Sequence, residues 1–276
     1  MIYTIERPKN FDLEHIFDCG QCFRFNKHKE KMNTYCGVAF GKYLEVSQDY
    51  NNVYFHNTTE EDYKNCWNNF FDMECDYNSI ISSFKDDKTL ADAAAFSSGI
   101  RILRQAPWET LCSFIISQNN NIPRIKGIIE NMSKAYGEEF CIDGEKFYAF
   151  PTSKALVDAG EDKIFALKTG FRAKYIYDAA YKIENGDINL DSIYDMNLDT
   201  AMQTLMKICG VGPKVASCVL LFGFSKYNAF PIDVWVKKIL ANYYADGISS
   251  HLSGKYAGIA QQYLFYYERC KNNVYL

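Results

Sequence analysis

A short glycine-rich turn, Gly210-Val211-Gly212, constrains the fold of this chain more than any other feature. The residues before it, 198–207, and after it, 213–224, are predicted to be helical, and Pro213 suits the first position of a helix. The two glycines predict a turn with backbone angles that other residues rarely adopt. We therefore expect a helix–hairpin–helix unit over about 198–224. Its second helix would begin with free backbone N–H groups, which can bind an anion such as a phosphate.

Two groups capable of chemistry follow the turn. Lys214 lies in the first turn of the second helix, where its amine is a candidate nucleophile, and Cys218 lies one helical turn further on the same face. Asp233 is predicted to cap the helix that continues through Lys238. Capping alone explains this aspartate, but its carboxylate could also stabilise a positive charge on a sugar. The residues themselves leave both roles open.

The distribution of charge permits DNA binding although the net charge is −4. Acidic residues dominate between residues 49 and 92. Between residues 205 and 240, Asp233 is the only acid beside five lysines, which are Lys207, Lys214, Lys226, Lys237 and Lys238. We expect a basic working face on an acidic body.

The fold class is predicted to be α+β. Up to about residue 60, aromatic and β-branched runs such as 43–46 and 52–55 alternate with turns and predict an antiparallel sheet. From Glu60 onward the pattern becomes helical and largely stays so. We expect an N-terminal β-containing domain over 1–100 and a helical domain over 101–276.

The cysteines and the N-terminus indicate the compartment. The ten cysteines are irregularly spaced, and the charged stretch 1–12 does not resemble a signal peptide. No apolar segment is long enough to span a membrane, so we expect a soluble cytoplasmic protein without disulfides. Cys270 is the only cysteine of the C-terminal region, which excludes a four-cysteine iron–sulfur cluster there.

Four further sites have residues suited to handling a nucleic acid. Residues 118–121 form a Gln-Asn-Asn-Asn corner, in which Asn121 is a predicted helix N-cap and the other amides could bond to bases. Phe171 beside Arg172 suits a wedge into stacked bases, as well as ordinary packing. Gln261 and Phe265 are neighbours on one face of the last helix. Gly20 is either a turn glycine or a backbone position that a ligand approaches closely.

In combination, these motifs resemble the helix–hairpin–helix DNA glycosylase superfamily and, within it, the bifunctional 8-oxoguanine DNA glycosylase/AP lyase family. The resemblance extends over nearly the whole chain. It rests on the hairpin with Lys214 and Asp233 and on five ordered segments, which are 20–25, 100–105, 117–122, 170–175 and 256–261.

The resemblance implies a role for each matched residue of the base pocket. Lys214 would attack C1′ of the sugar and form a Schiff base, and Asp233 would stabilise the sugar cation. The backbone carbonyl of Gly20 would accept the N7 hydrogen that only the oxidised base carries. Cys218 and Phe265 would sandwich the flipped base. Gln261 would bond to its Watson–Crick edge.

The resemblance also implies contacts with the rest of the DNA. Asn119 would fill the space that the base leaves, and Phe171 would be the wedge. Arg124 and Arg172 would read the orphaned cytosine, while Gly210 and Gly212 would lie against a phosphate. Finally, the resemblance implies a sodium, potassium or calcium ion, of structural importance only, on the backbone carbonyls of Met206, Ile208 and Val211.

Two positions depart from the family pattern. Trp235 stands where a histidine is typical of the eukaryotic enzymes, and Phe171 stands where a tyrosine is usual. The expected activity is excision of 8-oxoguanine opposite cytosine in duplex DNA, followed by strand cleavage. We expect the protein to be a monomer in the cytoplasm of a prokaryote and to need no cofactor for catalysis. An alkylpurine DNA glycosylase of the same fold and a non-catalytic helix–hairpin–helix DNA-binding protein are the alternatives.

Overall fold

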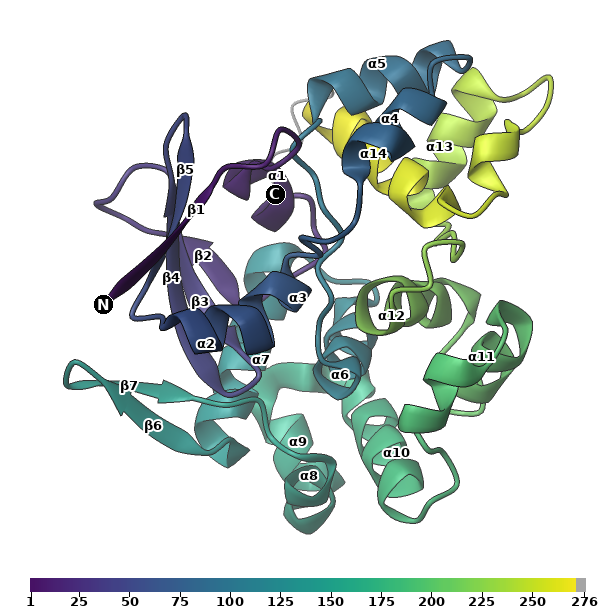
Figure 1. The fold of residues 1–276 in the computed structure, drawn as a ribbon. Helices are drawn as coiled ribbons and strands as arrows, with labels where there is room; N and C mark the ends of the chain where they lie inside the picture. The colour runs from purple at the N-terminus through teal and green to yellow at the C-terminus, as the bar shows by residue number, and fades with distance from the viewer. Residues whose placement is uncertain (272–276) are drawn as a thin grey trace.

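The N-terminal part of the protein is an antiparallel sheet, as predicted. A computed structural model describes residues 1–271, and its fold is shown in Figure 1. The sheet has the strand order β1-β5-β4-β3-β2. Its strands are β1 (Ile2–Glu6), β2 (Phe25–Lys27), β3 (Thr34–Ala39), β4 (Lys42–Gln48) and β5 (Asn52–His56).

One face of this sheet is covered by aromatic side chains. Leu44 and Val46 of β4 are completely buried, and Phe17 stacks on Phe25 with 4.5 Å between the ring centroids. Trp67 and the neighbouring phenylalanines of the segment after β5 close the same core. The α+β class is therefore confirmed, because an apolar sheet face must be buried against another layer.

The remainder of the chain is mainly helical. The helices are α1 (Leu13–Phe17), α2 (Glu60–Asp62), α3 (Asn68–Phe70), α4 (Tyr77–Ser83), α5 (Lys88–Phe96), α6 (Pro107–Ser117), α7 (Ile122–Tyr136), α8 (Ser153–Ala159), α9 (Glu161–Ile164), α10 (Ala173–Glu184), α11 (Leu198–Leu205), α12 (Pro213–Phe224), α13 (Val234–Tyr243) and α14 (Ala257–Lys271). The longest, α7 and α14, have 15 residues each. Within residues 1–271, no helix has the length and apolar character that a membrane crossing requires.

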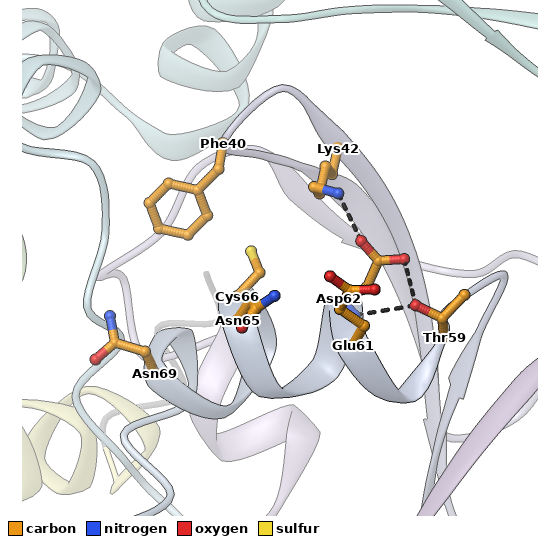
Figure 2. A pocket seen from close by; sticks show the side chains of 8 residues that line it. All are labelled: Phe40, Lys42, Thr59, Glu61, Asp62, Asn65, Cys66 and Asn69. Carbon is orange, nitrogen blue, oxygen red and sulfur yellow. Dashed lines mark hydrogen bonds and ion pairs between the residues drawn. The ribbon is translucent and has the colours of Figure 1, made fainter.

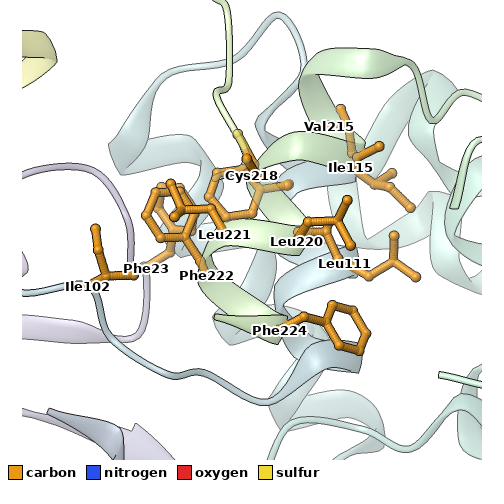
Figure 3. Packing of buried hydrophobic residues seen from close by; sticks show 14 of the residues in the cluster. Phe23, Ile102, Leu111, Ile115, Val215, Cys218, Leu220, Leu221, Phe222 and Phe224 are labelled. Carbon is orange, nitrogen blue, oxygen red and sulfur yellow. The ribbon is translucent and has the colours of Figure 1, made fainter. Parts of the chain in front are cut away.

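Helix α12 is the centre of the helical part. Every residue from Val215 to Phe224 is buried, so the helix is apolar on all sides, as a helix in the middle of a core must be. Its main partner is α6, and Phe114 of α6 stacks on Phe222 with centroids 5.4 Å apart. Figure 3 shows the side chains of both helices packed together. This core fixes the position of Lys214 at the start of α12.

The C-terminal helices pack beside helices from the first hundred residues. Figure 1 shows α4 and α5 next to α13 and α14. The hydroxyl of Tyr263 donates to the carbonyl of Ile100 at 3.1 Å, and that of Tyr244 donates to the carboxylate of Asp87 at 3.0 Å. Segments far apart in the chain thus lie side by side. The domain boundary near residue 100 stays a prediction.

A buried carboxylate connects the N-terminal part to the segment that leads to α13. Asp72 accepts hydrogen bonds from the hydroxyls of Tyr77 at 3.0 Å and Tyr227 at 2.6 Å. It also forms a 2.6 Å ion pair with Arg104. Because Tyr227 lies between α12 and α13, this network fixes the segment that presents Asp233.

The helical prediction after residue 60 is incomplete in one place. Strands β6 (Glu139–Ile142) and β7 (Glu145–Tyr148) form a separate antiparallel hairpin. Its two-residue turn is Asp143-Gly144, with φ of 50° and 84°, which is a favoured sequence for this turn. Phe147 packs on Tyr43 of the main sheet at 4.2 Å. A short two-stranded hairpin is only marginally stable alone, and packing on the main sheet explains its stability here.

Candidate active site

The hairpin between α11 and α12 is shaped by a close aromatic contact. Gly210 has a φ of 74°, and a Cβ atom at this position would lie 2.3 Å from the ring of Tyr175. Only glycine satisfies both constraints. The prediction of unusual angles is wrong for Gly212, whose φ of −98° and ψ of −178° are ordinary extended values. A Cβ at Gly212 would have no neighbour within 4 Å, so the space in front of α12 is open.

The hairpin is attached to α10 by polar contacts. The carboxylate of Asp178 accepts from the backbone N–H of Cys209 at 2.7 Å and from Nζ of Lys182 at 2.9 Å. Lys182 also donates to the carbonyl of Lys207 at 2.7 Å. A rigid support of this kind presents the N-terminus of α12 in one orientation.

The predicted base-pocket residues meet at a cavity of about 680 Å³ in front of α12. Gly20, Lys214, Asp233 and Phe265 line it. A narrow inner extension, which shares these four residues, adds Cys218 and Gln261. The structure therefore brings together residues from both ends of the chain around the lysine, as expected from the resemblance.

Lys214 and Cys218 form one wall of this cavity. Nζ of Lys214 lies 5.4 Å from the centroid of the Phe114 ring, and Cys218 is buried. Burial raises the pKa of the Cys218 thiol to about 11, although the positive charge of Lys214 acts in the opposite direction. The thiol is therefore uncharged at neutral pH, which suits a side chain that packs on the flat face of a base.

Asp233 caps α13 and also lines the cavity. Its Oδ1 atom accepts from the backbone N–H groups of Trp235 at 2.9 Å and Val236 at 2.8 Å, which confirms the predicted N-cap. Among residues 1–271, no hydrogen bond to Oδ2 is formed. The carboxylate thus keeps one oxygen without a hydrogen-bond partner among these residues, and Asp233 lines the same cavity as Lys214.

Gln261 has an unpaired acceptor in the inner part of the cavity. Its side chain is only 5% exposed, and Oε1 has no hydrogen-bond partner within the described part of the chain. A buried acceptor without a donor costs free energy, so its presence beside a cavity indicates a ligand that supplies an N–H. The Watson–Crick edge of guanine has such donors.

Arg269 is a residue of the cavity that the sequence did not single out. It lies one helical turn after Phe265, and its guanidinium carbon is 5.2 Å from the centroid of that ring. Burial lowers the pKa of Arg269, while the negative charge of Asp233 opposes this. Its Nε atom is buried without a partner among the described residues. The four-residue spacing from Phe265 was the only signal available.

The Gln-Asn-Asn-Asn corner is held by Arg172. The predicted N-cap is confirmed, since Asn121 accepts from the backbone N–H of Arg124 at 3.0 Å. Asn119 is exposed, has a φ of 48° and lines the cavity. The guanidinium of Arg172 donates to the carbonyls of Gln118 and Asn119, both at 2.9 Å, and of Thr169 at 3.2 Å. Arg172 therefore fixes the corner, a role that the sequence did not suggest.

Arg124 and Phe171 lie outside the cavity lining. Arg124 is exposed and close enough to lower the pKa of Arg172, after the larger effect of burial. The ring of Phe171 is 50% exposed and lies 4.4 Å from the guanidinium carbon of Arg172. Both side chains are thus available to an external partner near the corner.

The predicted cation site consists of backbone atoms alone. Ile208 and Val211 are buried, and the carbonyl of Ile208 accepts from the backbone N–H of Val211 at 3.1 Å. Over residues 1–271, no three His, Cys, Asp or Glu side chains are grouped to hold a metal ion. The three carbonyls of Met206, Ile208 and Val211 stay a predicted site for a weakly held cation.

A second cavity, of about 730 Å³, lies away from these residues (Figure 2). It is situated between the turn at Phe40 and helix α2, and Lys42 pairs with Asp62 at 2.6 Å on its wall. Burial raises the pKa of its Cys66 thiol to about 11, so this cavity lacks a ready nucleophile. The chemistry is concentrated at the Lys214 cavity.

Comparison with known proteins identifies two consecutive regions. Residues 4–111 match the family described as 8-oxoguanine DNA glycosylase, N-terminal domain. Residues 112–250 match the HhH-GPD superfamily of base excision DNA repair proteins. The two matches cover the sheet, the hairpin and both Lys214 and Asp233.

Solved structures and one curated relative agree with these matches. MBOgg1 in complex with a low-affinity DNA ligand is 39% identical, with a TM-score of 0.93 over 98% of this chain and 96% of that one. Clostridium acetobutylicum 8-oxoguanine glycosylase/lyase, in complex with DNA containing cytosine opposite 8-oxoguanine, is 41% identical, with a TM-score of 0.90 over 98% of each chain. The N-glycosylase/DNA lyase of Saccharomyces cerevisiae is 42% identical over 51% of this chain. That alignment spans 41% of the yeast protein, less than half of its length.

Proposed function

Because the chain belongs to the HhH-GPD superfamily of base excision DNA repair proteins, in its 8-oxoguanine DNA glycosylase family, we propose that it excises 8-oxoguanine from duplex DNA and then cleaves the strand. The observation that carries this proposal is the single cavity that joins Lys214, Asp233 and the unpaired acceptor of Gln261. A reacting base inside a duplex is inaccessible, so the enzyme must receive it in a flipped-out state.

The first chemical step uses Lys214 as the nucleophile. A lysine attacks only through its deprotonated amine, whose nitrogen forms a bond to C1′ while the bond from C1′ to the base breaks. The departing base takes up one proton from the attacking nitrogen. Asp233 stabilises the positive charge that develops on the sugar, through the oxygen that the helix cap leaves free.

Strand cleavage follows from the covalent bond. The sugar ring opens, and the nitrogen of Lys214 and C1′ form a Schiff base. This imine makes a C2′ hydrogen acidic, its proton is removed, and the 3′ phosphate leaves by β-elimination. Water then releases the lysine. A lysine is required for this sequence, since an enzyme that activates water alone forms no imine.

The choice of base rests on acceptors from both ends of the chain. 8-Oxoguanine differs from guanine in having a hydrogen on N7 and an oxygen on C8. The carbonyl of Gly20 would accept that hydrogen, and Oε1 of Gln261 would accept from the Watson–Crick edge. Phe265 and Cys218 would hold the two faces of the ring. An unpaired buried acceptor penalises a base that lacks the matching donor.

The remaining contacts would hold the DNA. The N-terminus of α12 and the open space at Gly212 suit a phosphate. Asn119 and Phe171 would occupy and wedge the stack, and Arg124 would reach the opposite cytosine. A cation on the hairpin carbonyls would support the phosphate contact, and we assign it no part in the chemistry. We propose that the protein acts as a monomer in the cytoplasm.

Borohydride trapping tests the proposal. The protein is incubated with duplexes that carry 8-oxoguanine opposite each of the four bases, and the imine is reduced to a stable adduct. We expect an adduct with the cytosine duplex and none from Lys214→Gln, which should still bind the duplex. An adduct of equal yield with Lys214→Gln, or excision of methylated purines in place of 8-oxoguanine, would contradict the proposal.

A further inference from the structure

The loop that contains Gly20 is anchored by carbonyls on both sides of this residue. The carbonyl of Cys19 accepts from Nε2 of Gln262 at 2.6 Å. The carbonyl of Gln21 accepts from Nε2 of Gln105 at 2.8 Å. Within residues 1–271, no donor reaches the carbonyl of Gly20. One free acceptor thus stands between two occupied ones, at the cavity wall.

Gly20 needs such anchors because its own conformation is permissive. It has a φ of 81°, in a region where glycine has access to several backbone states of similar energy. A peptide carbonyl next to such a residue can rotate unless the neighbouring peptides are fixed. A hydrogen bond to a base requires the acceptor within about 2.7–3.2 Å and in line with the donor. Rotation would therefore remove the bond to N7–H without removing any atom.

Gln262 is placed to prevent this rotation. Its side chain is 3% exposed and comes from α14, the helix that also carries Gln261 and Phe265. The bond from Gln262 to Cys19 joins residues that are 243 positions apart in the chain. It fixes the Gly20 loop directly to the helix that holds the rest of the base.

We propose that Gln262 is a positioning residue for lesion discrimination: its hydrogen bond to the Cys19 carbonyl orients the Gly20 carbonyl toward the N7 hydrogen of 8-oxoguanine. This inference rests on the proposed function of the cavity. Gln262 lines the inner cavity, but its amide donates to the Cys19 carbonyl, so we assign it a positioning role and not a catalytic one. Loss of Gln262 should reduce discrimination between 8-oxoguanine and guanine and should leave the reaction of Lys214 with an abasic sugar unchanged.

The test is the ratio of two dissociation constants, for a guanine:cytosine duplex and an 8-oxoguanine:cytosine duplex, measured with Lys214→Gln in the background to prevent chemistry. Gln262→Met removes the donor at similar volume. We expect the dissociation constant for the guanine duplex divided by that for the 8-oxoguanine duplex to fall about tenfold in this variant. This is the effect of one hydrogen bond, and it should come from weaker binding of the damaged duplex only. The matched control is Gln48→Met, which removes the hydrogen bonds of a glutamine in the N-terminal sheet and should keep the ratio.

Gln262→Glu gives a second readout. The protonated carboxyl can donate to the Cys19 carbonyl, and the carboxylate cannot, so discrimination by this variant should fall as the pH is raised through the pKa of the new carboxyl group. The parent Lys214→Gln protein should show no matching change over this range. A ratio for Gln262→Glu that is independent of pH and equal to that of the parent would overturn the proposal.

Trapping on a duplex with a preformed abasic site separates the possible failures. In the Lys214 background, Gln262→Met should react with this duplex at the parental rate. An equal loss of trapping on the abasic and the damaged duplex would show a general structural defect and refute a positioning role. If the parent protein itself forms no adduct with either duplex, the proposed function fails. If the parent reacts and Gln262→Met keeps full discrimination, only the role of Gln262 fails.

Discussion

Gly210 and Gly212 provide a prediction in which two similar substitutions have opposite effects. Gly210→Ala places a methyl group in a left-handed backbone state, which costs about 1–2 kcal/mol. The same methyl would lie 2.3 Å from the ring of Tyr175, and displacement of a packed ring adds roughly 1–3 kcal/mol. We expect the free energy of unfolding to fall by about 2–5 kcal/mol in total.

Gly212→Ala should behave differently although it lies two residues away. Its backbone angles suit alanine, and no atom lies within 4 Å of the new Cβ. A lower entropy of the unfolded chain should leave stability unchanged or raise it by about 0.4–1 kcal/mol. The methyl group would, however, stand in the open space before α12. We expect duplex binding to weaken about tenfold, since a phosphate could no longer approach the helix N-terminus.

The measurements are urea unfolding followed by circular dichroism, and duplex binding by fluorescence anisotropy at fixed salt. The double variant Gly210→Ala/Tyr175→Ala, compared with Tyr175→Ala alone, gives the backbone cost without the steric overlap, because the ring is absent from both proteins. Unfolding of Gly210→Ala at the same urea concentration as the parent would refute this steric argument. Equal binding by Gly212→Ala and the parent would refute the assignment of the phosphate to the start of α12.

Three further substitutions test other parts of the structure. Burial raises the pKa of the Glu109 carboxyl from 4.5 to about 7, with Arg24 opposing it, so the protonated form is favoured by folding. The free energy of unfolding should therefore fall as the pH rises from about 4.5 to 7. Glu109→Gln should remove this dependence on pH and raise the free energy of unfolding at pH 8 by about 1–2 kcal/mol, as measured by urea unfolding. Asp72→Asn should cost about 1–3 kcal/mol in thermal unfolding, because it weakens the buried hydrogen bonds from Tyr77 and Tyr227 and removes the ion pair with the partly exposed Arg104. Phe171→Ala should slow excision from a duplex about tenfold or more but not cleavage at a preformed abasic site, whereas an equal loss on both substrates would contradict the role of a wedge.

Features set by neighbouring residues were predicted well from the sequence. The caps at Asn121 and Asp233 follow from local hydrogen bonding, and α12 begins at Pro213 as expected. The hairpin of β6 and β7 was missed, although Asp143-Gly144 is a strong turn signal, because the surrounding segments favour helices. The angles of Gly212 were wrong because a glycine also occurs where space, and not conformation, is required.

Contacts between distant parts of the chain could not be predicted from local patterns. Arg172 was expected to face DNA, and nothing near it in the sequence indicates that carbonyls of the 118–119 backbone would occupy its guanidinium. Gln262 follows Gln261 directly and looks equivalent to it as a residue type. Only the three-dimensional packing of α14 shows that one amide is bonded to Cys19 and the other has a free oxygen.

The position of α14 has a consequence for the order in which the protein is made. Both reactive groups, Lys214 and Asp233, leave the ribosome before the helix over Ala257–Lys271 that completes the cavity. A nascent chain that stops before this helix therefore contains the nucleophile without Gln261, Gln262 or Phe265. On the proposed function, such a chain would lack the groups that hold a flipped base and orient the Gly20 carbonyl. Synthesis of α14 would thus couple the nucleophile to base selection, because a chain without this helix would contain the reactive lysine but not the groups proposed to choose its substrate.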